Sequence, residues 1–141
     1  MTQVREAMSG PVVTIDHNAA ASDAARMMRE NDTGDVVVTD AGKIVGILTD
    51  RDLAIRVVAE AIDPEVPIRE VHSTDPVTIA PDEELSAASE LMRENAIRRL
   101  PVCEGDNVVG FISLGDLATQ GATRTDADAT LSDISAAPPN R

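Results

Sequence analysis

Hydrophobic and polar positions in the first half of the chain follow two periodicities in turn. Ala24, Met27 and Met28 recur at spacings of three and four and predict an amphipathic helix, with Ser22 near its start as a candidate N-cap. The apolar runs at residues 36–39 and 43–48, separated by a small turn, then predict a β-hairpin. The other elements expected here are a lead-in helix at residues 4–8, a strand at 12–15 and a closing helix at 52–59.

The same order of elements recurs further along the chain. With an offset of 64 and no gap, residues 4–54 align with residues 68–118, and 18 of the 51 aligned pairs are identical. Several other pairs are conservative, such as Thr49 with Ser113. The second copy predicts a lead-in helix at 68–72, a strand at 77–79, a helix with Ser86 as candidate cap, and strands at 100–103 and 108–112. We therefore expect two copies of one unit that pack about a pseudo-twofold axis.

These elements define an α/β fold of two βαββα repeats. We assign residues 4–62 to repeat one and residues 68–120 to repeat two. The linker at residues 63–67 reads Asp-Pro-Glu-Val-Pro and ends the closing helix of repeat one. Residues 121–141 are rich in Thr, Asp, Ala and Pro with few apolar side chains, so we expect a disordered tail.

Charge and aromatic content narrow the classes of partner. The 141 residues include 25 Asp and Glu against 12 Lys and Arg, a formal net charge of −13, and Phe111 is the only aromatic residue. An acidic surface repels phosphate backbones, and a single ring offers little on which unpaired bases could stack. We therefore expect no nucleic-acid partner. An anionic ligand would need a local basic pocket.

The sequence carries no recognisable catalytic or metal-binding signature. Cys103 is the only cysteine, which excludes an intramolecular disulfide and a zinc site built on several thiolates. His17 and His72 lack the neighbours of a nucleophilic triad or a metal cluster, and no glycine-rich phosphate loop is present. No apolar run is long enough to cross a bilayer, and the first ten residues lack an apolar signal region. We expect a cytoplasmic, soluble protein that is not an enzyme and has no membrane partner.

Three motifs carry a family resemblance. Residues 46–53 read Gly-Ile-Leu-Thr-Asp-Arg-Asp-Leu, residues 110–117 read Gly-Phe-Ile-Ser-Leu-Gly-Asp-Leu, and residues 98–102 read Arg-Arg-Leu-Pro-Val. Over residues 4–118 the chain resembles a tandem CBS-domain protein, or Bateman module, of the small stand-alone bacterial type. The resemblance implies a regulatory module with no obligatory cofactor. Its ligand would be an adenosine compound such as AMP, ADP, ATP or S-adenosylmethionine, bound in clefts between the repeats.

The resemblance also implies roles for individual residues. Asp52 and Asp116 occupy the family position that binds the ribose diol, which suits a carboxylate because it can accept hydrogen bonds from both hydroxyls. Thr49 and Ser113 offer hydroxyls three residues earlier. The family pattern places Ile47, Val77 and Pro101 around the adenine of the first cleft.

Basic residues distinguish the two expected clefts. In nucleotide-binding relatives the phosphate is held by basic residues just before the Leu-Pro-Val strand of the opposite repeat, where this chain has Arg98 and Arg99. Their counterparts in repeat one are Gly34 and Asp35, which cannot hold a phosphate. We therefore expect one competent nucleotide site, with Thr49, Asp52, Arg98 and Arg99, and one degenerate site, with Ser113 and Asp116.

Alternative interpretations of these residues stay open. Asp52 and Asp116 are also suitable as helix-capping acids, and Arg98 with Arg99 could be a solvated pair. Arg51 and Arg56 could reach an anion or simply balance Asp50 and Glu60. A different class of function is an interaction or scaffold protein with vestigial clefts.

The apolar stretch containing Ile55, Val57, Val58 and Ile62 exceeds what one core face requires, so we expect a homodimer in addition to an unknown regulated protein.

Overall fold

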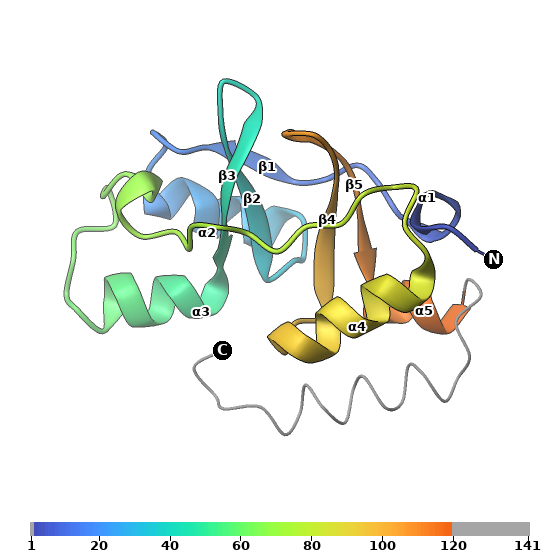
Figure 1. The fold of residues 1–141 in the computed structure, drawn as a ribbon. Helices are drawn as coiled ribbons and strands as arrows, with labels where there is room; N and C mark the ends of the chain where they lie inside the picture. Colours follow the sequence, from blue (N-terminus) through green and yellow to red (C-terminus); the bar gives the residue numbers. More distant parts are fainter. Residues whose placement is uncertain (1, 120–141) are drawn as a thin grey trace. The chain divides into compact units, whose positions relative to one another are not determined.

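The computed structural model describes residues 2–119, which form two compact units (Figure 1). The first unit comprises residues 12–76, and the second comprises residues 2–11 together with residues 77–119. We describe each unit by itself. The tail expected at residues 121–141 lies outside the described residues.

The first unit is built on a three-stranded sheet. Strand β1 (Thr14–Asp16) runs parallel to β2 (Asp35–Asp40), which is antiparallel to β3 (Lys43–Thr49). Helix α2 (Ala21–Glu30) joins β1 to β2 and buries Ala21, Ala24 and Met28. After β3 come α3 (Asp50–Leu53), the π-helix η1 (Ala54–Val58) and the 3-10 helix η2 (Ile68–Glu70). The core consists of Ile15, Ala21, Ala24, Met28, Val36, Val38, Leu48, Val57, Ile68 and Val71.

The second unit repeats the helix and hairpin of the first. It contains α1 (Val4–Ala7), α4 (Leu85–Asn95), β4 (Arg99–Glu104), β5 (Asn107–Ser113) and α5 (Leu114–Thr119). Its core consists of Val4, Ala7, Ile79, Leu85, Ala88, Met92, Leu100, Val102, Ile112 and Leu117. The α/β class and the doubled unit expected from the sequence are confirmed.

The two hairpins share one register, including the position of a bulge. Asp35 pairs with Thr49 as Arg99 pairs with Ser113, and Val37 pairs with Ile47 as Pro101 pairs with Phe111. The register shifts between Val38 and Thr39 in one hairpin and between Val102 and Cys103 in the other. Every one of these pairs follows the offset of 64, so the repeat in the sequence is also a repeat of strand pairing.

Each lead-in segment packs on the hairpin of the other repeat. Ser9 and Phe111 exchange main-chain hydrogen bonds of 2.8 and 2.9 Å, and the equivalent Ser73 and Ile47 exchange bonds of 3.1 and 3.2 Å. Residues 2–11 therefore belong to the second unit, although they begin the first sequence repeat. The compact units differ in this respect from the ranges 4–62 and 68–120 assigned from the sequence.

Two glycines permit this packing. A Cβ atom at Gly46 would collide with the His72 ring and the Ser73 carbonyl oxygen, and one at Gly110 would lie 3.0 Å from the Met8 sulfur and from the Ser9 carbonyl oxygen. The requirement is spatial, because the neighbouring backbone occupies the volume of a side chain.

Several local predictions differ from the structure. Residues 77–79 contribute only an isolated bridge between Ile79 and Val102 rather than a strand of their own. Ser22 and Ser86 are not N-caps, since α2 and α4 begin after Ala20 and Glu84. The Ser22 hydroxyl instead donates to Glu65 at 3.2 Å, while the Asp23 carboxylate accepts from the Ala20 N–H and so satisfies part of the helix start. The closing helix of repeat one is an α-helical turn followed by a π-helix.

None of the helices in the described part of the chain is long and apolar enough to cross a membrane.

Candidate functional site

Each predicted ribose-binding acid stands in a reciprocal helix cap at the end of a hairpin. The Thr49 hydroxyl accepts from the Asp52 N–H at 3.0 Å, and the Asp52 carboxylate accepts from the Thr49 N–H at 3.0 Å. Ser113 and Asp116 make the same pair at 3.1 and 2.9 Å. This arrangement satisfies main-chain groups at the helix start, so both acids have a structural role in helix capping. Only Oδ2 of each carboxylate is used in the cap, and Oδ1 faces other groups.

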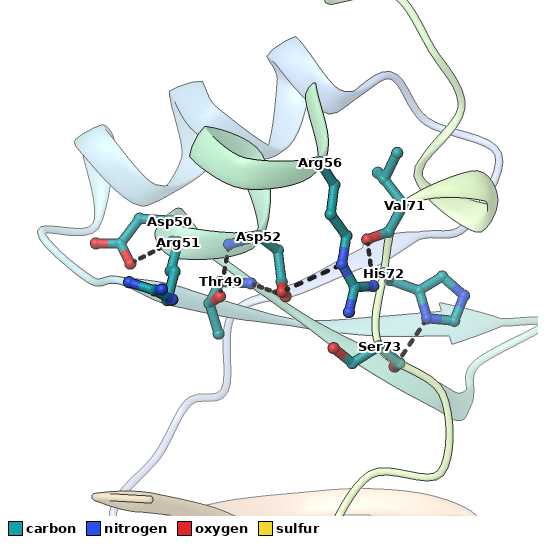
Figure 2. A network of polar contacts seen from close by, with 8 residues as sticks. All are labelled: Thr49, Asp50, Arg51, Asp52, Arg56, Val71, His72 and Ser73. Carbon is teal, nitrogen blue, oxygen red and sulfur yellow. Dashed lines mark hydrogen bonds and ion pairs between the residues drawn. The ribbon is translucent and has the colours of Figure 1, made fainter. Parts of the chain in front are cut away.

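In the first unit the second oxygen of Asp52 faces a cation. Asp52 Oδ1 lies 3.8 Å from Arg56 Nε, and Arg56 Nη1 donates to the Val71 carbonyl at 3.1 Å (Figure 2). The Asp52 side chain is 15% exposed and the Arg56 side chain 47% exposed, so water still reaches both. Arg56 connects the π-helix to the segment that follows η2. It balances Asp52 rather than the expected Asp50 and Glu60.

In the second unit a hydroxyl takes the place of that cation. Ser9 Oγ donates toward Asp116, at 3.3 Å from Oδ1 and 3.5 Å from Oδ2. Ser73, the equivalent of Ser9, contributes main-chain hydrogen bonds to Ile47, and its carbonyl also contacts the His72 ring at 3.0 Å. Two acids with equivalent positions and equivalent caps therefore have different side-chain partners.

The two predicted phosphate-binding arginines differ from each other. Arg98 is exposed just before β4, and its carbonyl accepts from the Leu114 N–H at 2.9 Å. Arg99 begins β4 as the strand partner of Ser113, and its guanidinium carbon lies 4.0 Å from the centroid of the Phe111 ring. That distance is within the range of a cation–π interaction. The Arg99 head group is thus held against the middle of the hairpin.

The equivalent positions in the first unit carry no cation. Gly34 repeats the main-chain contact of Arg98, since its carbonyl accepts from the Asp50 N–H at 2.9 Å. Asp35 begins β2 as the strand partner of Thr49, where Arg99 pairs with Ser113. The backbone is therefore the same in both units, whereas the side-chain charge is reversed.

The predicted adenine-binding residues lie in both units. Ile47 is half-buried in β3 of the first unit. Val77 packs beside the core of the second unit, and Pro101 is buried in β4, where its carbonyl accepts from the Ile79 N–H at 3.1 Å. Thr49 and Asp52 likewise belong to the first unit, and Arg98 and Arg99 to the second. The structure thus places each half of the predicted competent site within its own unit.

Among residues 2–119, no group of three or more His, Cys, Asp or Glu is arranged to hold a metal ion. Cys103 is buried, and burial, with a smaller effect from the charge of Asp106, raises the pKa of its thiol. Nε2 of His17 lies 3.4 Å from Oδ1 of Asp40.

Sequence reasoning did not predict the contacts that three residues make at these sites. Arg56 stands four positions after Asp52, a spacing at which opposite charges meet on a helix. Ser9 is identical to Ser73 in the repeat, but only the packing of residues 2–11 on the second unit brings it to Asp116. Phe111 is the only aromatic residue in the sequence, and the predicted hairpin places it diagonally opposite Arg99.

Comparison with known proteins now identifies the repeat. The model of the CBS domain matches residues 4–59 and again residues 68–121. The chain belongs to the CBS domain family. It therefore carries a pair of CBS domains, as the motifs predicted.

Similar proteins also carry CBS domains. The CBS domain-containing protein YhcV of Bacillus subtilis (strain 168) is 38% identical over 135 residues, which cover 96% of each chain. The crystal structure of a conserved CBS domain protein of unknown function from Thermoplasma acidophilum, TA0289, has a TM-score of 0.82 at 27% identity and covers 96% of this chain and 77% of that one. The CBS domain pair of protein MJ0100, in complex with 5′-methylthioadenosine and S-adenosyl-L-methionine, has a TM-score of 0.74 at 26% identity. The match covers 83% of this chain and 93% of that one.

Proposed function

We propose that this CBS pair is a non-enzymatic regulatory module that binds an adenosine nucleotide of the AMP, ADP or ATP class. One observation carries the proposal: an acid and a hydroxyl recur at the end of the hairpin in both units, whereas arginines precede and begin the first hairpin strand in only one copy, at Arg98 and Arg99. The complex of the MJ0100 pair with two adenosine compounds supports a ligand of this type. S-adenosylmethionine, an adenosine compound without a phosphate, is the other ligand that the family resemblance implies.

Asp52 is proposed to bind the ribose. An ionised carboxylate offers about four acceptor positions, and the cap uses one of them through Oδ2. Oδ1 lies 3.8 Å from Arg56, which is too far for a hydrogen bond. A vicinal diol could therefore donate to this carboxylate without breaking the helix cap. Thr49 adds a hydroxyl beside it.

Arg98 and Arg99 are proposed to hold the phosphate of the same nucleotide, as the family resemblance implies. A guanidinium donates two parallel hydrogen bonds to a phosphate, and this geometry is stronger than a single point charge. Ile47, Val77 and Pro101 would form the apolar slot for adenine. Binding would favour one arrangement of the two repeats over another and so change the surface offered to a regulated protein.

The second site, with Ser113 and Asp116, is proposed to be degenerate. Its carboxylate is already approached by the Ser9 hydroxyl. The clamp positions of repeat one are Gly34 and Asp35, and a carboxylate repels phosphate. An uncharged adenosine derivative would avoid this repulsion.

Titration calorimetry with AMP tests the site assignment. We expect one AMP per chain, affinity reduced by about tenfold or more in Asp52→Ala because charge-assisted hydrogen bonds are lost, and little change in Asp116→Ala. Two equal AMP sites would overturn the asymmetry. Loss of binding in Asp116→Ala with retention in Asp52→Ala would mean that Arg99 serves the acid of its own unit, and this assignment would be wrong.

The absorption spectrum of freshly purified protein gives a second test. With no Trp and no Tyr, the chain has almost no near-ultraviolet absorption of its own, so a co-purified adenine would dominate the spectrum. Denaturation should release the absorbing species for identification by chromatography.

A scaffold protein with vestigial clefts is the second candidate. It is favoured by the capping contacts, which give both acids a structural role without any ligand. Thermal stabilisation by AMP separates the two functions, because only a binding module gains stability from its ligand. A sensor should lose this stabilisation in Arg99→Ala, whereas a scaffold should show none in the wild type.

We also propose a homodimer that forms through the π-helix and the residues after it. Ile55, Val58 and Ile62 are 51%, 75% and 39% exposed, while Val57, expected to belong to the same surface, packs into the core at 4%. Three large apolar side chains exposed at helical spacing favour burial against a second copy.

A further inference from the structure

Phe111 is the only aromatic residue in the chain, and its ring lies under the guanidinium of Arg99. The distance from the guanidinium carbon to the ring centroid is 4.0 Å. Arg99 and Phe111 are diagonal neighbours on β4 and β5, since Arg99 pairs with Ser113 and Pro101 pairs with Phe111. Because side chains alternate along a strand, both lie on the face opposite the buried Leu100 and Ile112.

The internal repeat shows that the cation and the ring differ together. At the equivalent positions of the first unit, Asp35 stands for Arg99 and Ile47 stands for Phe111. The strand register and the bulge are the same in both hairpins. The unit with the cation therefore has the ring, and the unit without the cation has an aliphatic side chain at that position.

A stacked guanidinium can still bind phosphate. The ring covers one flat face of the guanidinium, whereas the N–H donors point outward in its plane. Stacking also restricts a long side chain before a ligand arrives, which reduces the conformational entropy lost on binding. The ring thus orients the donors without competing for them.

We propose that Phe111 is a positioning residue for Arg99 and that it contributes to recognition of the ligand's phosphate. This inference rests on the proposed function, in which Arg99 contacts the phosphate of an adenosine nucleotide. It holds whichever of the two acids binds the ribose, since it concerns only the cation.

Parallel titrations with AMP and adenosine test the inference, because adenosine lacks the phosphate. Phe111→Leu removes the ring and keeps an apolar side chain, and Phe111→Tyr keeps a ring. We expect Phe111→Leu to weaken AMP binding by about three- to tenfold and to leave adenosine binding unchanged. Phe111→Tyr should restore AMP affinity.

A double-mutant cycle with Arg99→Ala provides the matched control. If the ring acts through Arg99, Phe111→Leu should have no further effect on AMP affinity in the Arg99→Ala background. Unchanged AMP affinity in Phe111→Leu, or equal weakening of AMP and adenosine, would overturn the inference while leaving the proposed function intact.

The stacking itself can be measured without any ligand. The ring current of Phe111 should shift the side-chain proton resonances of Arg99 upfield in the wild type, and the shift should disappear in Phe111→Leu. A wild type without this shift would overturn the positioning role. A wild type that binds neither AMP nor adenosine would overturn the proposed function, and the phosphate role of Arg99 and Phe111 with it.

Discussion

The hydroxyl oxygen of Ser9 lies 3.3 Å from Oδ1 of Asp116, although 107 positions separate the two residues in the sequence. The contact connects the N-terminal segment to the first turn of helix α5 in the second unit. At the equivalent place in the first unit, Arg56 rather than Ser73 faces the acid. Repetition of the backbone has therefore not preserved the side-chain environment of the two carboxylates.

Replacing Ser9 by alanine should lower the free energy of unfolding. The hydrogen bond is long, so we expect a loss near the lower end of the range for such contacts, about 0.5–1 kcal/mol. Ser73→Ala is the matched control, because Ser73 serves its neighbours through main-chain groups. Urea titrations of both variants measure the difference, and equal losses would show that the hydroxyl of Ser9 contributes nothing specific.

Much of this fold could be predicted because the same pattern occurs twice. The hairpins, their shared register and the two capped acids follow from residues that recur at an offset of 64. The packing of Ser9 on the second unit could not be predicted, because periodicity places a helix or a strand but does not say which hairpin a lead-in segment covers. The caps at Ser22 and Ser86 were wrong because each helix begins one residue before its serine, at Ala21 and at Leu85.

The candidate site likewise has features that the sequence predicts and features that it does not. Thr49 and Asp52 lie together because three residues span one helical turn, and sequence spacing is enough to predict that. The partner of Asp52 depended on the π-helix that carries Arg56, and the partner of Arg99 depended on strand register. Sequence spacing permits both contacts but does not show which of the permitted pairs form.

Alanine at Gly46 should destabilise the protein strongly. The new Cβ would meet the Ser73 carbonyl oxygen, which is backbone and cannot rotate away. We expect a loss of about 1–3 kcal/mol, the usual cost of overpacking. Thermal unfolding followed by circular dichroism measures the effect.

Gly115→Ala is the contrasting variant. Gly115 lies in α5, and a Cβ atom at this position would have the Ser113 hydroxyl as its nearest neighbour, at 3.7 Å, which is an ordinary van der Waals contact. Alanine should therefore raise stability by up to about 1 kcal/mol through its higher helix propensity. If both glycine variants were destabilised equally, the close approach at Gly46 would not be the reason for its glycine.

Stability at alkaline pH should depend on Cys103. Burial and the charge of Asp106 raise the pKa of this thiol above 9.0 in the folded state. The unfolded chain then loses the thiol proton at a lower pH than the folded chain. The contribution of the neutral thiol is therefore fully present below the unfolded pKa and is lost as pH rises through the folded pKa.

Cys103→Ala removes the ionisable thiol and leaves every other titratable group in place. Between conditions below and well above pH 9.0, the wild type should lose more of its free energy of unfolding than the variant does. Denaturant titrations of both proteins under reducing conditions measure the difference. Parallel pH profiles would mean that the thiol ionises equally easily in the folded and unfolded chains.

A charged residue at Val58 should dissociate the proposed homodimer. Val58 is 75% exposed, so aspartate there has little effect on the core of its own unit, but it would place a charge in an apolar interface. Size-exclusion chromatography with light scattering at micromolar concentration should give a dimer for the wild type and a monomer for Val58→Asp. Val109→Asp is the control, because Val109 is also exposed, at 40%, but lies on β5 of the other unit. A monomeric wild type, or dissociation by both variants, would contradict an interface through the π-helix.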